Sequence, residues 1–107
     1  MSTAHPPTQI SDNTADSRFE IRTTTPDGEL LAGFAAYQLH GECITFTHTE
    51  ILDGFEGRGL GGALAAGALD GARAAGQLVT PLCPFIAAYI RRHSGYRDIV
   101  DPADDFR

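Results

Sequence analysis

The chain has 107 residues and a formal net charge of −6, and its eight Lys and Arg side chains are all arginines. A chain of this length forms one compact domain, because two separate cores would each be too small to be stable. An acidic chain without clustered cations is also a poor match for nucleic acid, since phosphate contacts need such clusters. We therefore expect a single domain without a nucleic-acid partner.

Both ends of the chain are polar. Residues 1–17 contain proline and almost no large apolar side chain, so they predict a flexible tail whose ordering entropy burial cannot offset. Residues 101–107 predict an acidic C-terminal tail. No stretch reads as a secretory signal or is apolar enough to cross a membrane, which predicts a cytoplasmic protein without a membrane partner.

Three strands are predicted after the N-terminal tail. The segment 18–24, "RFEIRTT", alternates apolar and polar residues with the period of a half-buried strand. A turn at 26–29 leads to a second strand, "LLAGFAAYQL", and a turn at 40–42 leads to a third strand at 43–51. Short connections between consecutive strands predict an antiparallel meander.

The second half of the chain predicts two helices with a strand between them. In the segment 60–76, leucines stand at near-helical spacing among alanines, and Gly76 would end that helix. The apolar run "QLVTPLC" at 77–83 predicts a short strand, which a crossover helix would place parallel to its neighbour. A second helix at 84–93 begins with Pro84. The predicted fold class is α+β, a mixed sheet with the order β-β-β-α-β-α.

The run "EGRGLGGAL" at 56–64 stands at the mouth of the first helix. Its glycines would let backbone amides converge on an anion at a helix N-terminus, which suits a pyrophosphate. They would equally allow a tight turn and close packing of the helix on the sheet. Gly57, Gly59 and Gly62 also fit the dinucleotide pattern G-x-G-x-x-G, but that pattern belongs to a first βαβ unit with an acidic residue about 20 residues further on. The three preceding strands, and the lack of an acid at 76–84, argue against a dinucleotide site.

The element order and this loop resemble the GNAT-type N-acetyltransferase superfamily, whose pyrophosphate loop reads [RQ]-x-x-G-x-[GA]. Here the loop runs from Glu56 to Gly61, and Glu56 replaces the polar or cationic residue at the first position. The segments "THTEI", "PLCPFIAAYIRRH" and "YRDIV" resemble the minimal branch of that superfamily, which carries a cysteine-proline pair after its fourth core strand. The resemblance covers about residues 18–100.

The resemblance implies a GNAT-like domain that moves an acetyl group from acetyl-coenzyme A (acetyl-CoA) to an unidentified amine, which could belong to a small molecule, a peptide or a protein. Two other interpretations are a non-catalytic module that binds coenzyme A and a small interaction domain that binds no coenzyme. No metal is expected, and the chain is expected to be a monomer or a weak dimer. The residues implied to contact the coenzyme are Ile51 and Leu52 at the pantetheine arm, Gly57, Arg58, Gly59, Leu60 and Gly61 at the pyrophosphate, and Tyr89 and Arg92 from the second helix. For Arg58, Tyr89 and Arg92, a solvated charge or an ordinary core contact is the competing interpretation.

Cys83 precedes Pro84 and so stands at the N-terminus of the second predicted helix, where the helix dipole favours thiolate over thiol. It could accept the acetyl group as a thioester, line the groove beside the coenzyme thiol, or be buried for packing alone. In the branch that the chain resembles, this cysteine faces the acetyl-CoA site. Cys43 is expected to be structural, and both thiols are expected to be free, because the chain is expected to be cytosolic. A zinc site is not expected, because neither cysteine has a second Cys or His at ligand spacing.

His48 and Glu50 are the candidate bases. By strand alternation they share a face with Ile44 and Phe46, so an apolar face is expected to become polar just before the glycine loop. Acetyl transfer needs a neutral amine, and an imidazole or a carboxylate can remove its proton. Both side chains could instead be solvated where the sheet splays.

Overall fold

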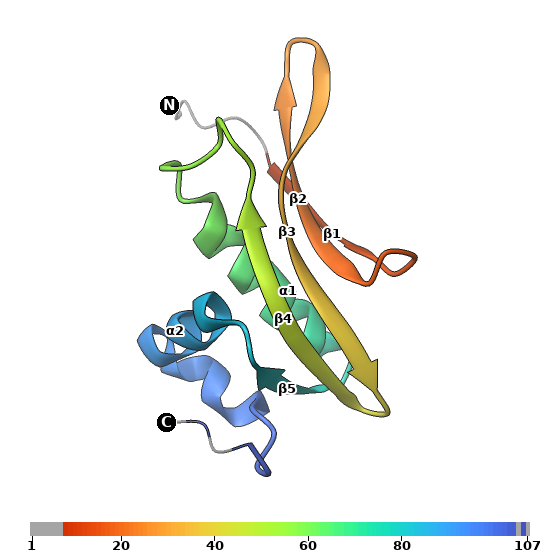
Figure 1. Cartoon of the computed structure of the whole chain (residues 1–107), viewed down its shortest axis with the longest axis vertical. Coiled ribbons are helices and arrows are strands. Elements are labelled where there is room, and N and C mark those ends of the chain that lie inside the picture. Colours follow the sequence, from red (N-terminus) through yellow and green to blue (C-terminus); the bar gives the residue numbers. More distant parts are fainter. Residues whose placement is uncertain (1–7, 105, 107) are drawn as a thin grey trace.

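The computed structural model describes residues 8–104 and 106, and its centre is a five-stranded sheet (Figure 1). The strands lie in the order β1-β2-β3-β4-β5, with antiparallel pairs from β1 to β4 and a parallel pair between β4 and β5. The elements are β1 (Thr8–Asn13), β2 (Arg18–Thr25), β3 (Gly28–His40), β4 (Cys43–Ile51), α1 (Leu60–Ala74), β5 (Leu78–Pro81), α2 (Pro84–Arg92) and the 3-10 helix η1 (Ser94–Ile99). The predicted mixed sheet and its parallel pair are confirmed, with one more strand at the N-terminal end than the sequence predicts.

That additional strand, β1, corrects the prediction of a flexible N-terminal tail. It pairs with β2 along its whole length. Side-chain contacts also hold it: the Tyr37 hydroxyl donates a 2.6 Å hydrogen bond to the Asp12 carboxylate, and Ile10 packs over Gly67 of α1. Composition does not reveal such an edge strand, because its neighbour supplies the hydrogen bonds and one apolar side chain is enough to anchor it. Residues 1–7 lie outside the described residues.

The C-terminal segment is packed on the domain in the part that the structure describes. Phe106 lies against the core, and the guanidinium groups of Arg91 and Arg97 lie 5.0 and 5.1 Å from its ring centroid. Residues 105 and 107 lie outside the described residues. An aromatic side chain therefore anchors a segment that composition predicts to be an acidic tail.

The core lies between the sheet and α1, which crosses behind β3 and β4 in Figure 1. The rings of Phe19, Tyr37 and Phe46 gather there, with centroids 5.6 to 6.3 Å apart. The side chains of α1 that cover them are small or aliphatic: Leu64, Ala65, Ala68, Leu69 and Ala72. Small residues are needed because the helix lies close to the sheet: a Cβ on Gly71 would lie 2.8 Å from the Phe19 ring.

A β-bulge interrupts β4 at Thr47. Ala36 of β3 pairs with His48, but the next residue, Tyr37, pairs with Phe46, so Thr47 has no partner in this register. A bulge adds one residue to one strand and moves every later side chain of that strand to the opposite face.

The bulge makes the predicted alternation wrong. His48 and Glu50 do not share a face with Phe46. Both stand on the open face of the sheet, where Glu50 is paired with Phe34 of β3. The side chain of His48 is 61% exposed and that of Glu50 is 50% exposed. Thr49 takes the position that faces the core. The letters "CITFTHTEI" contain no signal for this shift, since polar residues occupy both faces after Phe46.

The open face carries a charged network across β1, β2 and β3. The Glu20 side chain is only 4% exposed, and its carboxylate accepts hydrogen bonds from Asn13 at 2.9 Å and from Arg18 and Arg22 at 2.8 Å each. These bonds, with the Asn13 bond the largest effect, lower the pKa of Glu20 to about 2. The Arg18 guanidinium also lies 4.7 Å from the Phe34 ring centroid, which ties the network to β3.

Candidate active site

The glycine loop turns through two residues in the left-handed region. Gly57 has a φ of 79° and Gly59 a φ of 75°, values that other residues rarely adopt. A Cβ on either glycine would meet nothing within 4 Å, so the space above the loop is open. The conformation therefore requires both glycines, and it leaves the loop backbone accessible.

Helix α1 begins directly after this loop without a side-chain cap. Gly59 is its N-cap residue, and the first turn contains no acidic side chain. The first amides of a helix have no partner inside the helix, and the helix dipole favours an anion at that end. The loop and the first turn of α1 together suit an anion with several oxygens.

Of the first-turn glycines of α1, Gly61 serves close packing and Gly62 does not. A Cβ on Gly61 would lie 2.8 Å from the Phe85 ring, and one on Gly62 would lie 3.8 Å from the Tyr89 ring. Gly61 therefore allows α2 to approach the N-terminal end of α1. The glycine run therefore has two uses. Gly61 fits the interpretation as close packing, and the open loop at Gly57 and Gly59 fits the interpretation as an anion site.

A hollow of about 630 Å³ lies between the loop, the end of β4 and α2, and we name it the α1–α2 hollow. It brings together most of the residues implied to contact a coenzyme: Ile51, Gly57, Gly59, Leu60, Gly61, Tyr89 and Arg92. Other lining residues were not singled out for this purpose by the sequence: Phe55, Glu56, Gly62, Ala63, Phe85 and His93. Leu52 and Arg58 do not line it.

His93 is a polar lining residue that the sequence analysis does not assign to the coenzyme site. Its ring stacks on Tyr89 at a centroid distance of 4.0 Å, and its Nδ1 lies 2.9 Å from the Tyr89 carbonyl oxygen. Because a carbonyl only accepts, Nδ1 donates this bond, and in the neutral imidazole Nε2 is then the acceptor. The signal was the helical spacing of Tyr89, Arg92 and His93, which places all three on one side of α2.

Strand β4 extends beyond its partner β5. The parallel ladder joins Cys43–Phe46 to Leu78–Pro81, and a last bond of 2.9 Å runs from the Cys83 amide to the Phe46 carbonyl. The rest of β4 continues past that point, so the two strands separate next to the α1–α2 hollow.

The backbone of this overhang corrects one expectation. The Leu52 amide donates to the Ala32 carbonyl at 2.8 Å and the Leu52 carbonyl accepts from the Phe55 amide at 3.0 Å, so both groups are engaged within the protein. Because successive strand residues point their backbone groups to alternate sides, Thr49 and Ile51 direct theirs away from β3, into the strand separation. Ile51 keeps the geometry expected of a pantetheine partner, and Leu52 does not.

Cys83 caps α2, and Pro84 is the first helical residue, as the sequence predicts. The side chain is 2% exposed, and its Sγ lies 3.3 Å from Oγ1 of Thr49, to which the thiol donates. It lines neither of the two hollows described in this section. The thiol thus stands at a helix N-terminus beneath the strand separation, with Thr49 as a neighbour that the sequence did not indicate.

The candidate bases are not beside this thiol. His48 Nε2 and Glu50 Oε1 lie 3.3 Å apart on the open face of the sheet, whereas Cys83 contacts Thr49 on the helix-covered face. Strand β4 itself separates the pair from the cysteine. The structure therefore brings His48 and Glu50 together but does not join them to Cys83.

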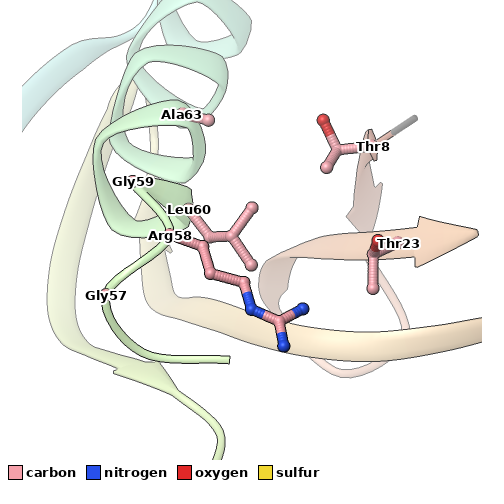
Figure 2. A pocket seen from close by; sticks show the side chains of 7 residues that line it. All are labelled: Thr8, Thr23, Gly57, Arg58, Gly59, Leu60 and Ala63. Carbon is pink, nitrogen blue, oxygen red and sulfur yellow. The ribbon is translucent and has the colours of Figure 1, made fainter. Parts of the chain in front are cut away.

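Arg58 points away from the α1–α2 hollow. Figure 2 shows its guanidinium extending from the loop toward Thr23 of β2. It lines a second hollow, of about 450 Å³, which we name the β1–β2 hollow and whose walls are Thr8, Thr23, Gly57, Arg58, Gly59, Leu60 and Ala63. The sequence could not indicate Thr8 here, because it predicts no strand at that position.

Within the described ranges, no group of three or more His, Cys, Asp and Glu side chains is arranged to hold a metal ion. None of the helices in the described part of the chain has the length and apolar character to span a membrane. Cys43 and Cys83 are both free, and the Cys43 thiol donates to Asp101 Oδ2 at 3.4 Å.

Comparisons with known proteins agree with the resemblance seen in the sequence. The family model of the GCN5-related N-acetyl-transferase matches residues 18–99. The NMR solution structure of a GCN5-like candidate N-acetyltransferase from Staphylococcus aureus has a similar fold, with a TM-score of 0.64, 18% sequence identity and coverage of 91% of each chain. No curated protein sequence matches the chain. The family match spans most of the domain and indicates an acetyltransferase, and we conclude that the chain belongs to the GCN5-related N-acetyl-transferase family.

Proposed function

We propose that the protein transfers an acetyl group from acetyl-CoA to the nitrogen of an amine. The observation that carries this proposal is the α1–α2 hollow, which joins the open glycine loop to the point where β4 leaves β5. A coenzyme A thioester needs both features, because its diphosphate requires converging amides and its extended arm requires an exposed strand edge. The family match supports the same chemistry in general terms.

In this proposal the diphosphate accepts hydrogen bonds from the amides around Gly57 and Gly59, and Arg92 adds positive charge from α2. The pantetheine arm runs along the overhang of β4 and bonds to the backbone of Ile51, with Tyr89 on its other side. Support comes from the hollow, which all five of these residues line. The thioester end of the arm would then reach the separation of the strands.

Two routes connect the thioester to the amine. In the direct route the amine nitrogen attacks the acetyl carbonyl carbon and the coenzyme thiolate leaves. In the covalent route the Cys83 sulfur attacks that carbon, its proton passes to the departing coenzyme sulfur, and the amine then attacks the new thioester and releases Cys83. The covalent route requires Cys83 to give up its hydrogen bond to Thr49.

In either route the amine nitrogen loses one proton, and we assign its removal to the pair His48 and Glu50. Their 3.3 Å contact orients the imidazole, which can hold the proton while the carboxylate stabilises the resulting cation. Because the pair stands on the open face of the sheet, the acceptor amine would approach the strand separation from that face while the coenzyme enters from the helix side.

A coenzyme A-binding module without catalysis is the second candidate function. Two observations favour it: Glu56 lines the α1–α2 hollow, where it would repel a diphosphate, and β4 separates Cys83 from the candidate bases. Binding without turnover would be its signature.

Isothermal titration with acetyl-CoA, desulfo-coenzyme A and NAD tests the coenzyme site first. We expect the first two to bind and NAD not to bind. A panel of amines and peptides is then screened for acceleration of thiol release from acetyl-CoA. Binding without accelerated release would favour the module, and absence of binding would refute both functions.

Intact-mass measurement after exposure to acetyl-CoA separates the two routes. The covalent route predicts a hydroxylamine-labile acetyl adduct that Cys83→Ser abolishes and the control Cys43→Ser retains. Substantial transfer by Cys83→Ser, together with no adduct on the parent protein, would leave only the direct route.

Replacing Glu56 by Gln tests its proposed repulsion of the diphosphate. The change restores a residue of the family loop pattern, and we expect acetyl-CoA to bind roughly three- to tenfold more tightly because a like charge is removed. Asp53→Asn is the matched control, since Asp53 is exposed in the same connection but does not line the hollow. An equal gain in acetyl-CoA affinity in both variants would show that the change in net charge, and not the position of Glu56, causes the effect.

A further inference from the structure

We propose that the β1–β2 hollow binds the phosphorylated adenosine end of coenzyme A, so that the coenzyme bends over the glycine loop with one arm in each hollow. This inference rests on the proposed use of coenzyme A. The two hollows meet at the loop and the start of α1, where both are lined by Gly57, Gly59, Leu60 and Ala63. A diphosphate bound to the loop amides can therefore send pantetheine toward the strand separation and its nucleoside toward β2.

Thr23 is the first group that indicates a ligand in this hollow. It is a polar residue with 4% exposure, and its hydroxyl has no hydrogen bond to another described residue. Every fully enclosed side-chain oxygen and nitrogen in the described part of the chain has a partner, so this hydroxyl must be reachable from the hollow that Thr23 lines. A hydroxyl held in a recess without a protein partner is unfavourable unless a ligand or water bonds to it.

Thr8 adds a second hydroxyl on the same wall. The register of β1 and β2 places Thr8 directly opposite Thr23, and residues paired in an antiparallel ladder share a face. Figure 2 shows both side chains across the hollow from the loop. The pair presents donors and acceptors suited to a ribose and its phosphate.

Arg58 supplies the charge. Its guanidinium extends across the hollow toward Thr23, and the guanidinium carbon lies 5.5 Å from the Phe55 ring centroid. None of the ion pairs among the described residues includes it. In a chain with a net charge of −6, an arginine without a carboxylate partner is available to a phosphate, which its planar fork fits.

The remaining walls and the size of the hollow agree with a nucleoside. Leu60 and Ala63 give it an apolar side for a base, and its 450 Å³ falls within the roughly 300–1,000 Å³ of small-molecule sites. The pantetheine end is a poor occupant, because its thioester must reach the strand separation beside the other hollow.

The test compares coenzyme A with 3′-dephospho-coenzyme A by isothermal titration. The two ligands differ only in the phosphate that Arg58 is proposed to hold. We expect the parent protein to bind coenzyme A roughly tenfold or more tightly, and Arg58→Gln to reduce that ratio to near one. The control Arg97→Gln removes the same charge from η1, which lines neither hollow, and should keep the parent ratio.

Thr23→Val tests the wall of the hollow with a side chain of similar shape. We expect coenzyme A to bind several-fold more weakly, while Thr24→Val, one residue along β2 on the exposed face, has no effect. Thermal melting of both variants establishes that they are folded. In NMR spectra, adenosine 3′,5′-bisphosphate should shift the amide signals of Thr8 and Thr23.

The outcomes separate this inference from the proposed function. Tight binding of coenzyme A with equal affinity for the dephospho form, or an equal loss of both affinities in Arg58→Gln, would overturn the adenosine site alone. Shifts from inorganic phosphate equal to those from the bisphosphate would also overturn it, because they would show a simple anion site. Failure of the parent to bind any coenzyme A would overturn the proposed function and this inference together.

Discussion

The glycines of the loop and the glycines packed inside the domain are needed for opposite reasons. Gly57 and Gly59 have open space where a Cβ would stand, and their positive φ is what requires glycine. Gly33 and Gly71 have no such φ, but a Cβ on either would lie within 3 Å of a neighbour. The first pair keeps a backbone accessible and the second lets elements approach. The same residue type therefore indicates a binding site only where the space beside it is empty.

Gly33→Ala is expected to have the largest effect. Its Cβ would lie 2.6 Å from the Glu50 carbonyl oxygen and 2.7 Å from Ile51 Cδ1. Because the first contact is with a backbone atom, no side chain can turn aside, and β3 would be pushed from β4 at the end of the overhang, where Gly33 pairs with Ile51. We expect a loss of about 3 kcal/mol or more in the free energy of unfolding, measured by urea denaturation. Gly95→Ala, where nothing lies within 4 Å, is the control, and equal stability of the two variants would contradict the close approach of β3 and β4.

Gly59→Val is expected to act on binding. Its side chain would fill the open space that the loop offers to the diphosphate, and we expect acetyl-CoA affinity to fall about a hundredfold, or about 2.7 kcal/mol, by titration. The positive φ of 75° adds backbone strain, so Gly54→Ala serves as the control: its φ is 92°, but it lines neither hollow. A folded Gly59→Val protein with unchanged affinity would refute the loop as the diphosphate site.

Gly71→Ala is expected to reduce stability and leave binding unchanged. The added methyl group would lie 2.8 Å from the ring of Phe19, which is 6% exposed and packed among other aromatic rings. The overpacking outweighs the better helix propensity of alanine, for a net loss of about 1–2 kcal/mol in thermal or urea unfolding. Weakened acetyl-CoA binding by this variant would show that packing and binding glycines are not separable.

Gly62→Ala is expected to have the smallest effect and the opposite sign. The nearest atom to its Cβ would be in the Tyr89 ring at 3.8 Å, an ordinary contact, so alanine should gain about 0.5 kcal/mol from helix propensity. The same substitution in the same helix would thus raise the melting temperature at one position and lower it at the other. A lower melting temperature for Gly62→Ala would mean that α2 lies closer to α1 than the structure has it.

The sequence indicates only one side of this contrast between loop glycines and packed glycines. Gly57 and Gly59 stand between a strand and a helix, and that local context already suggests a turn with an accessible backbone. Nothing near Gly33 or Gly71 indicates their neighbours, because Glu50 and Phe19 lie far away along the chain. The local backbone conformation of a glycine is predictable from the sequence, whereas the space beside its Cα is not.

The candidate site divides in the same way. Ile51, Tyr89 and Arg92 could be assigned to one hollow from a resemblance, and the structure brings them together there. The sequence does not reveal that the Leu52 backbone is unavailable to a ligand, because the hydrogen bonds of its amide to Ala32 and of its carbonyl to Phe55 form only in the folded chain. Simple alternation places His48 on the wrong face, because the bulge at Thr47 moves every later side chain of β4 to the opposite face.

The sequence by itself determined the order of the strands and helices from Arg18 to Arg92, the glycine loop at the mouth of α1 and the position of Cys83 at the start of α2. These follow from periodicity and from the backbone preferences of Gly and Pro, which act over a few residues. The tertiary structure alone decided that Thr8–Asn13 form a strand, which face His48 takes, and that Arg58 opens onto a second hollow with Thr23. Each of these depends on partners distant in the chain, and a strand register or a cavity exists only once those partners meet.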